Sequence, residues 1–381
     1  MEKIWVNSGD SHFTEPDDLW ARYLPAEVAE RMPRSVKDPD GAFETVHVDG
    51  QAFRRPMPKP IREGEHKGLN IIEVGDRPPG ARDVTRRLAD LDEEGIWAEV
   101  CFPSLGLWST YIRSAELARA GAQALNRWAA EEIAAASPRL VPCASLPLVE
   151  VGDAVAELER CAGEGFHAVF LPVDPPEGHW NEERWGPLWA AAEACGVVVA
   201  FHIGTDRVAP QIYRNPGGAI LNYVETTYGG QRAAAQLVAN GTLARHPGLR
   251  VLVAEGGATW APFLGDRLNE GYRQHAVMAW PKLEMLPKEY IYRQVYCSFQ
   301  HDVTAIPTLT SMGYRNVMFG SDYPHLEGTF GHTQATLREL FDGQPDDVRY
   351  RITIGSFLDL FPHVGPPPQA VIPDGVTAPA A

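Results

Sequence analysis

Residues 6–16 read VNSGDSHFTEP, and the rest of the chain is organised around this stretch. Residues 4–8 are expected to form a strand, so Asp10 and His12 fall just beyond its end. Because alternate residues of an extended segment point to the same side, we expect the carboxylate and the imidazole to face one point. Together they offer two ligands for a divalent cation. An Asp-x-His pair is more often a surface feature without a metal, so the rest of the chain must decide whether Asp10 and His12 bind one.

The composition is that of a globular protein with a sizeable core. Hydrophobic residues make up 44% of the 381 positions and charged residues 22%, which argues against extended disorder. The 50 acidic residues against 34 basic ones give a net charge of -16, which would repel nucleic acid and anionic membrane surfaces. We therefore expect a small-molecule substrate rather than either of those partners, and we expect a homo-oligomer.

The cysteines and the apolar runs indicate the compartment. Five scattered cysteines without a Cys-x-x-Cys pair suggest neither a disulfide framework nor a thiolate zinc site. No basic-then-apolar signal begins the chain, and charged residues interrupt every apolar run before it reaches membrane-spanning length. A cytoplasmic location is the expectation.

Strands and helices are predicted to alternate along the chain. Continuous apolar runs such as VVVAF at 197–201 are typical of strands buried on both faces, which indicates a parallel sheet. Eight such strands with helices between them favour a (β/α)8 TIM barrel. An open doubly wound sheet is the rival fold, but it usually carries a Gly-rich turn where this chain has Asp and His. The predicted strands are 4–8, 97–102, 140–144, 168–171, 197–201, 249–254, 294–299 and 316–319, and the predicted helices are 16–31, 84–94, 114–136, 150–163, 183–194, 224–240, 258–275, 303–312, 332–342 and 347–361.

Residues 1–361 are predicted to form a single barrel domain. Residues 33–80 are rich in Pro and Gly without a sustained period, so they are expected to be an insertion after the first strand. Residues 362–381 contain three consecutive prolines and many small residues, so this tail should be loosely ordered.

Ligand-type side chains follow five of the eight predicted strands. In a parallel barrel the carboxyl ends of the strands meet at one mouth, where chemistry takes place. A lone buried His is more often structural, but so many coincidences at strand ends favour a metal site. Strands two and three end in Pro103 and in Leu146-Pro147, so the polar groups should converge on one side of the mouth. The candidate metal ligands are Asp10, His12, His202, Glu255, His301 and Asp322, with His325 and Glu327 close behind.

Several motifs together resemble a known family, the amidohydrolase superfamily, and within it the branch with aminocarboxymuconate semialdehyde decarboxylase and related carboxy-lyases. The resemblance covers residues 4–361. It rests on Asp10-Ser11-His12 with Glu15-Pro16, on Phe201-His202, on His246-Pro247 leading into Ala254-Glu255-Gly256-Gly257, and on Gly320-Ser321-Asp322-Tyr323-Pro324.

The resemblance implies metal ligands at His12, His202 and Asp322, with Asp10 where many members have the first His of a His-x-His pair. The chain departs from the family in two places. Glu255 stands where decarboxylating members place a catalytic His after strand six, and His301 is added after strand seven.

Three functions remain open at this point. In the first, one or two divalent ions (zinc, manganese or iron) support hydrolysis or non-oxidative decarboxylation of a carboxylated or cyclic substrate, Asp322 moves a proton and His325 assists it. In the second, Glu255 bridges two irons bound by the remaining candidate ligands, including His301, and the protein is a non-haem di-iron oxygenase that hydroxylates a large hydrophobic acid. In the third, the barrel is inactive and serves as a binding protein.

Overall fold

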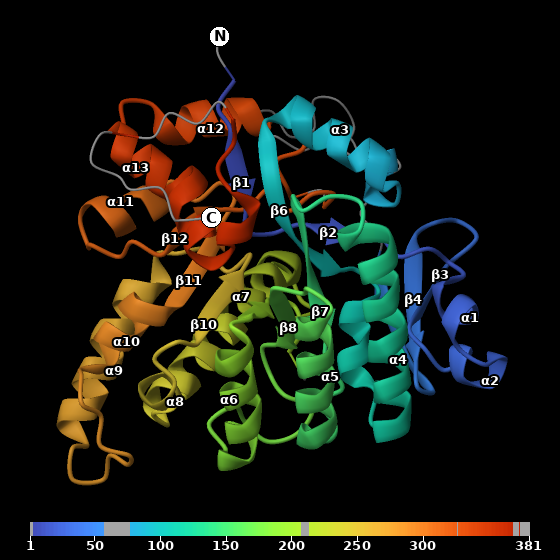
Figure 1. Ribbon diagram of the computed structural model, residues 1–381, viewed down its shortest axis with the longest axis horizontal. Helices are drawn as coiled ribbons and strands as arrows, with labels where there is room; N and C mark the ends of the chain where they lie inside the picture. Colours follow the sequence, from blue (N-terminus) through green and yellow to red (C-terminus); the bar gives the residue numbers. More distant parts are fainter. Residues whose placement is uncertain (1–2, 57–76, 207–212, 326, 369–372, 374–381) are drawn as a thin grey trace.

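The computed structural model describes residues 3–56, 77–206, 213–325, 327–368 and 373. Eight parallel strands follow one another around a barrel in the order β1-β6-β7-β8-β9-β10-β11-β12, with helices on the outside (Figure 1). This confirms the predicted fold class. The strands are β1 (Val6–Ser8), β6 (Ile96–Pro103), β7 (Leu140–Ser145), β8 (Ala168–Pro172), β9 (Val198–His202), β10 (Arg250–Ala254), β11 (Val295–Phe299) and β12 (Val317–Phe319).

Backbone hydrogen bonds beyond the ends of β1 and β12 close the barrel. The Gly9 amide donates to the Phe319 carbonyl at 2.8 Å, and the His12 amide donates to the Tyr323 carbonyl at 2.6 Å. In the opposite direction, the Asp322 amide donates to the Asp10 carbonyl at 3.0 Å. The short strand β2 (His12–Phe13) also pairs with β6. Because the first and last strands are joined, the open doubly wound sheet is excluded.

The outer helices follow the predicted alternation, with interruptions. The predicted helix 16–31 is two short helices, because Leu24 precedes Pro25 and takes an extended conformation that a helix cannot contain. The predicted helices 114–136 and 347–361 each include a π-helical segment, at 129–134 and 351–355. The α-helices are α1 (Leu19–Tyr23), α2 (Ala26–Ala29), α3 (Val84–Glu94), α4 (Ala115–Trp128), α5 (Val151–Gly163), α6 (Gly186–Cys195), α7 (Gly218–Ala239), α8 (Thr242–Arg245), α9 (Trp260–Gln274), α10 (Pro287–Gln294), α11 (Ala305–Thr310), α12 (Thr333–Phe341), α13 (Asp346–Tyr350) and α14 (Ser356–Leu360).

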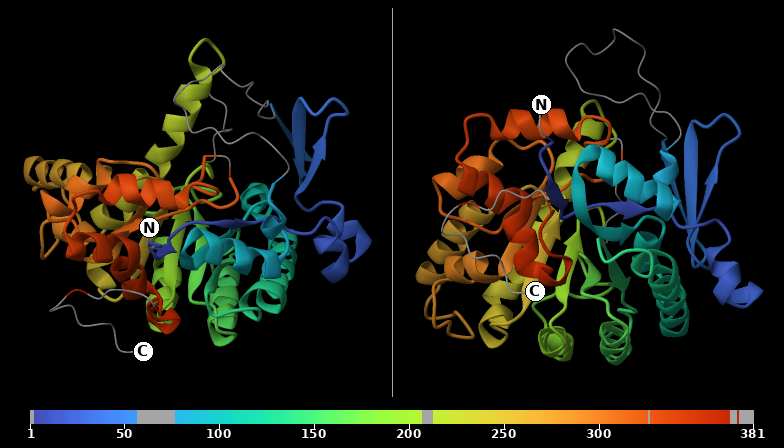
Figure 2. Two further views of the ribbon diagram at one scale, coloured as in Figure 1. Left: turned by 90° about the horizontal axis from the view of Figure 1, so that it is seen from above. Right: turned by 45° about the horizontal axis from the view of Figure 1, so that its top comes forward.

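The segment predicted as an insertion contains a small sheet. Strands β3 (Arg34–Lys37), β4 (Phe43–Val48) and β5 (Gln51–Pro56) pair antiparallel and stand beside the barrel with α1 and α2 (Figure 2). Side chains of β4 alternate between half-buried and buried, which is the period-two pattern of a sheet with one covered face. Residues 57–76 and most of the predicted tail lie outside the described residues, so the boundaries 33–80 and 362–381 remain predictions.

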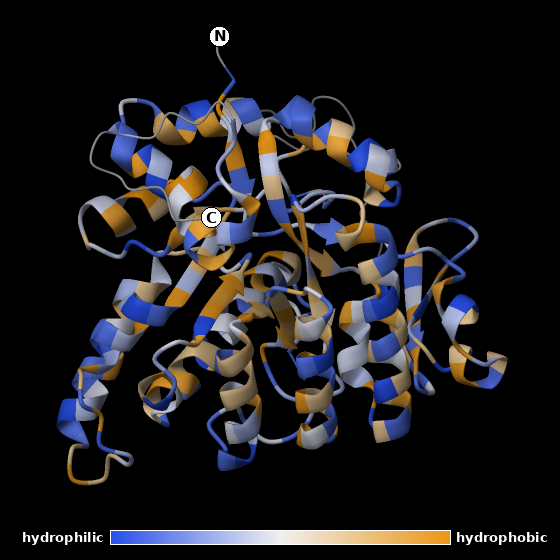
Figure 3. Cartoon of the chain, in the orientation of Figure 1, coloured by the Kyte–Doolittle hydropathy of each residue, from blue (hydrophilic) through white to orange (hydrophobic). Residues whose placement is uncertain are grey.

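Apolar side chains fill both faces of the barrel strands. In β9, Val198 and Ala200 belong to a cluster inside the barrel, while Val199 and Phe201 pack between the strands and the helices. Figure 3 shows the strands largely in the hydrophobic colour and the helices mixed. Burial on both faces explains why the strands appear in the sequence as continuous apolar runs. No helix in the described parts of the chain is both long and apolar enough to cross a membrane.

A buried ion pair connects α3 to the strands below the mouth. Arg87 and Glu99 are both fully buried, and the Arg87 Nε lies 2.5 Å from the Glu99 Oε1. The Arg87 Nη1 donates to the His12 carbonyl at 2.6 Å. The guanidinium also lies over the rings of Phe13 and Tyr323, at 4.2 and 4.4 Å from their centroids. One side chain therefore contacts β2, β6 and the segment that follows β12.

Breaking this ion pair should destabilise the whole barrel. Glu99→Gln leaves the Arg87 charge buried without a counter-charge, so the free energy of unfolding should fall by about 3–5 kcal/mol. Urea denaturation measures the change. The double variant Arg87→Met/Glu99→Leu should lose less than the single one, since it buries no charge. Glu131→Gln, which breaks an exposed pair with Arg127, is the control and should leave the free energy of unfolding nearly unchanged. A double variant that loses as much stability as Glu99→Gln, or more, would contradict this account.

Candidate metal centre

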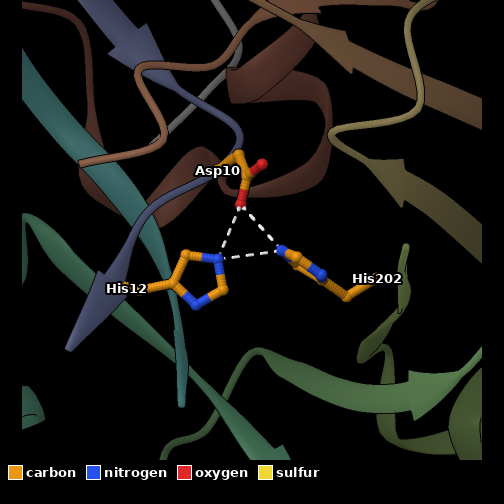
Figure 4. Close-up of side chains that lie close together, drawn as sticks. All are labelled: Asp10, His12 and His202. Carbon is orange, nitrogen blue, oxygen red and sulfur yellow. Dashed lines mark hydrogen bonds and ion pairs between the residues drawn. The ribbon is translucent and has the colours of Figure 1, made fainter. Parts of the chain in front are cut away.

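Three buried side chains point at one another from the ends of β1 and β9 (Figure 4). The Nε2 atoms of His12 and His202 lie 2.9 Å apart. The Asp10 Oδ1 lies 3.4 Å from the His202 Nε2 and 3.8 Å from the His12 Nε2. Asp10 and His12 are fully buried, and His202 is nearly so. The structure thus brings together three of the residues that the sequence predicted as ligands.

The hydrogen bonds of the two imidazoles favour a cation at this point. The His12 Nδ1 lies 3.2 Å from the Pro103 carbonyl, and the His202 Nδ1 lies 2.9 Å from the Ile203 carbonyl. A ring N–H that donates to a carbonyl leaves the other ring nitrogen as a lone pair, which is how metal-binding His residues are oriented. Two lone pairs 2.9 Å apart repel each other, so either a metal ion or a proton must lie between the two nitrogens.

The Asp10 carboxylate completes a donor set that fits a divalent metal. Neither of its oxygens has a hydrogen-bond partner among the described residues, although both are buried. Such an uncompensated carboxylate is costly in a protein interior unless it binds a cation. Two nitrogens and one oxygen separated by 2.9 to 3.8 Å also have the spacing of atoms around a single ion at about 2.0–2.2 Å.

Asp322 and His325 also lie against His12. The His325 Nδ1 is 2.8 Å from the Asp322 Oδ1, and the His12 Nε2 is 3.6 Å from the same oxygen. The His325 ring lies 4.2 Å from the His12 ring, tilted by 30°. Asp322 has a left-handed φ of 52°, a conformation that non-glycine residues hold only under constraint. Its hydrogen bond to Asp10 supplies part of that constraint.

Glu255 extends the cluster from the end of β10. Its Oε2 lies 3.6 Å from the His202 Nε2, and it forms a third group of potential ligands with Asp10 and Asp322. Its φ of 59° is also left-handed, which turns the residue after Ala254 back toward the mouth. The Glu255 amide donates to the Ser298 Oγ at 2.9 Å, and this bond holds the turn.

The cluster changes the protonation of its members. Burial lowers the pKa of His12 well below its usual value, and His325 and His202 add to the effect. Burial would lower the pKa of His202 too, but the Asp10 and Glu255 carboxylates raise it to about 9. Burial raises the pKa of Glu255 well above normal, and Asp322 raises it further. The site is therefore rich in groups whose protons depend on one another, as functional sites often are.

His301 does not join the cluster. Among the described residues it belongs to none of the groups of potential ligands, and its side chain is exposed. Its Nε2 lies 3.2 Å from the Glu327 carbonyl, and its ring stacks on His332 at 5.7 Å. His301 lies two residues beyond the end of β11. Within that strand Tyr296 faces the barrel interior while Val295, Cys297 and Phe299 face outward, so an odd-numbered position continues the outward side.

Sequence reasoning overlooked one neighbour of the site, Phe102. The Phe102 ring lies 4.7 Å from the His202 ring and 5.9 Å from the His12 ring, so it forms an apolar wall of the centre. Glu15 is buried, and its two carboxylate oxygens accept from the amides of Leu105 and Gly106, both at 2.8 Å. Alternation along β6 could have indicated Phe102, because it shares the inward parity of Ala98 and Val100.

Metal content should separate the cluster from His301. His202→Ala removes one nitrogen donor, so the purified variant should hold well under half of the divalent metal that the wild type holds, measured by inductively coupled plasma mass spectrometry. His301→Ala should match the wild type, because its side chain lies apart. Equal metal in His202→Ala and wild type, or loss of metal only in His301→Ala, would contradict the assignment.

Comparisons with known proteins agree with the fold. The amidohydrolase family profile matches residues 102–355. The 2-amino-3-carboxymuconate-6-semialdehyde decarboxylase of Dictyostelium discoideum is 26% identical over 213 residues, which cover 53% of this chain and 56% of that protein. The chain thus spans a little over half the length of this relative.

Solved structures match over nearly the whole chain. An amidohydrolase from Mycobacterium avium subsp. paratuberculosis superposes with a TM-score of 0.76 and 21% identity, covering 95% of this chain and 100% of that one. A dihydroxybenzoic acid decarboxylase from Polaromonas with bound manganese gives a TM-score of 0.60 and 18% identity, with coverage of 94% and 97%. At these identities the two likenesses establish the barrel and its connectivity.

Proposed function

The chain belongs to the amidohydrolase family, and from this premise we propose that it is a metal-dependent enzyme that removes a carboxylate from, or hydrolyses, a carboxylated or cyclic small molecule. Non-oxidative decarboxylation is the reaction we favour. The observation that carries the proposal is the pair of the buried Asp322 and the half-buried His325, 2.8 Å apart and beside the candidate ligand His12. The decarboxylase names of the Dictyostelium relative and of the manganese-bound neighbour support it.

Asp322 is suited to donate a proton. Burial raises the pKa of its carboxyl well above normal, and the carboxyl groups of Asp10 and Glu327 raise it further, so the protonated acid is favoured more than in an ordinary carboxyl group. Loss of CO2 leaves an electron pair on the carbon that carried the carboxyl group, and that carbon needs a proton. A positioned acid typically accelerates such a transfer by 10²–10⁴-fold.

His325 is placed to act through Asp322. Burial lowers the pKa of His325 to about 4, so its imidazole is neutral under physiological conditions. A neutral imidazole in contact with the acid can relay a proton to it from solvent between turnovers, taking one proton on Nε2 as it gives one from Nδ1. The pair would fill the role that the family gives to the His after strand six, where this chain has Glu255.

A divalent ion held by Asp10, His12 and His202 would supply Lewis-acid polarisation of the substrate carboxylate. The residues themselves fix its position, since two carbonyl groups orient the imidazoles. Phe102 would exclude water from one side of the reacting carbon. Manganese, zinc and iron all suit nitrogen and carboxylate donors.

Release of CO2 from a panel of carboxylated aromatic and cyclic acids tests the function. Asp322→Asn keeps the side-chain volume but removes the acid, so turnover should fall by about 10²–10⁴-fold with a substrate found for the wild type. Asp359→Asn, which alters an ion pair with Arg351 away from the centre, is the control and should retain turnover. Undiminished activity in Asp322→Asn would remove the proton-donor role.

A di-iron oxygenase is the second candidate function. It is favoured by one observation, the overlap of the ligand groups: Asp10 and Asp322 belong both to groups with His12 and to a carboxylate group with Glu255. Overlapping groups of this kind could hold two ions. Oxygen uptake by the iron-loaded protein, measured with the same panel of carboxylated acids, distinguishes this candidate from the carboxy-lyase.

A further inference from the structure

One hydroxyl group closes the turn that begins at the candidate ligand His202. Residues 202–205 read HIGT, and the Thr205 Oγ1 donates to the His202 carbonyl at 2.6 Å. Gly204 has a left-handed φ of 72°, which lets the chain reverse within these four residues. Thr205 is buried, so this hydrogen bond is shielded from solvent. The turn is therefore held in one shape from within.

The shape of this turn decides where the imidazole of His202 points. The Ile203 carbonyl belongs to the turn and lies 2.9 Å from the His202 Nδ1. A ring N–H that donates to this carbonyl fixes the orientation of the ring and leaves Nε2 as the free donor atom. In that orientation Nε2 faces Asp10 and His12. Because Thr205 holds the turn, it also holds the carbonyl that orients the ring.

The same hydroxyl joins the turn to the neighbouring strand. The Val173 amide, directly after β8, donates to the Thr205 Oγ1 at 2.9 Å. The hydroxyl thus gives one hydrogen bond and accepts another, and both partners are backbone groups at the carboxyl ends of β8 and β9. A valine side chain would have nearly the same shape as this threonine but could form neither bond.

Helix α7 clamps the residue that follows the turn, Asp206. The Arg232 Nη2 lies 2.8 Å from the Asp206 Oδ1, and the same guanidinium lies 3.0 and 3.2 Å from the two carboxylate oxygens of Asp174. The Tyr111 hydroxyl donates to the Asp206 carbonyl at 3.3 Å. The helix packs tightly here, since a Cβ on Gly229 would lie 2.8 Å from the Asp206 Oδ1. The segments after β6, β8 and β9 therefore meet beside the turn and support it from outside.

We infer that Thr205 is a positioning residue for the candidate metal ligand His202, because its hydroxyl closes the turn 202–205 and thereby aims the imidazole at Asp10 and His12. The inference rests on the metal-dependent site of the proposed function, since it concerns one ligand of that site. Thr205 acts through the backbone carbonyls of His202 and Ile203. The Arg232 clamp supports the same turn at one remove.

Metal affinity, measured without turnover, tests the inference. Dissociation constants for Mn²⁺ are measured by isothermal titration of the metal-free protein, and visible spectra of the cobalt-loaded protein report the geometry of the ligands. Thr205→Val removes both hydrogen bonds, so the dissociation constant should rise about tenfold, the lower end of the loss seen when an outer partner of a metal ligand is removed. The cobalt absorption bands should shift as well. Thr205→Ser keeps the hydroxyl and should restore the affinity and the spectrum of the wild type.

Thr353→Val is the matched control. It removes a buried hydroxyl that donates to the Arg349 carbonyl at 2.8 Å. The helical segment that contains it is bonded to Arg315, ahead of the amino end of β12 and so away from the mouth. Urea denaturation reports any loss of stability in this variant, but its Mn²⁺ affinity and cobalt spectrum should equal those of the wild type.

Equal Mn²⁺ affinity in Thr205→Val and wild type would overturn the inference. Equal losses in Thr205→Ser and Thr205→Val would also overturn it, because the hydroxyl would then not be the cause. If Thr205→Val does not fold, Thr205→Ala decides in its place, since the smaller side chain leaves room for a water at the Val173 amide; it should weaken Mn²⁺ binding, and unchanged affinity would overturn the inference. A wild type that binds no Mn²⁺ would overturn it together with the candidate centre. A wild type that binds Mn²⁺ and shows these differences but releases no CO2 would support the inference and count against the proposed decarboxylation alone.

Discussion

Closure of the barrel between its first and last strands is the constraint on which the candidate centre depends. Two backbone bonds in opposite directions, from His12 to Tyr323 and from Asp322 to Asp10, join segments more than 300 positions apart in the chain. The same bonds set the side chains of Asp10, His12 and Asp322 facing inward. The geometry of the candidate ligands is thus a consequence of barrel closure between the first and last strands. Arg87 supports this geometry because its guanidinium donates to the His12 carbonyl.

The arrangement concentrates negative charge at a point where a bound cation would compensate it. Asp10, Glu255 and Asp322 share a water-poor space, and two of them have raised pKa values because burial and neighbouring carboxyl groups oppose ionisation. Left-handed backbone at Glu255 and Asp322 shows that the fold holds both residues in conformations that they would not choose freely. Strain of this kind is common where function, and not stability, determines the geometry.

Much of the fold could be predicted because its signals are local. Continuous apolar runs and their spacing indicated all eight barrel strands, and the polar residues after them indicated which end carries the chemistry. The small sheet 34–56 was missed because its strands belong to no β/α repeat and only one of its faces is covered. That His301 lies apart from the cluster could not be predicted, because position after a strand was weighed without inward or outward parity, which separates it from His202. The left-handed turn that brings Glu255 inward depends on Ser298, a contact between neighbouring strands that no local pattern contains.

A crystal structure of the zinc-loaded protein, with an anomalous difference map at the zinc edge, tests the central claim most directly. The account predicts one strong peak about 2.0–2.1 Å from the Nε2 atoms of both His12 and His202, with Asp10 as a further ligand. No peak at that place would contradict it. So would a peak only at the stacked His167 and His363 rings, which lie 3.5 Å apart at the opposite end of the barrel.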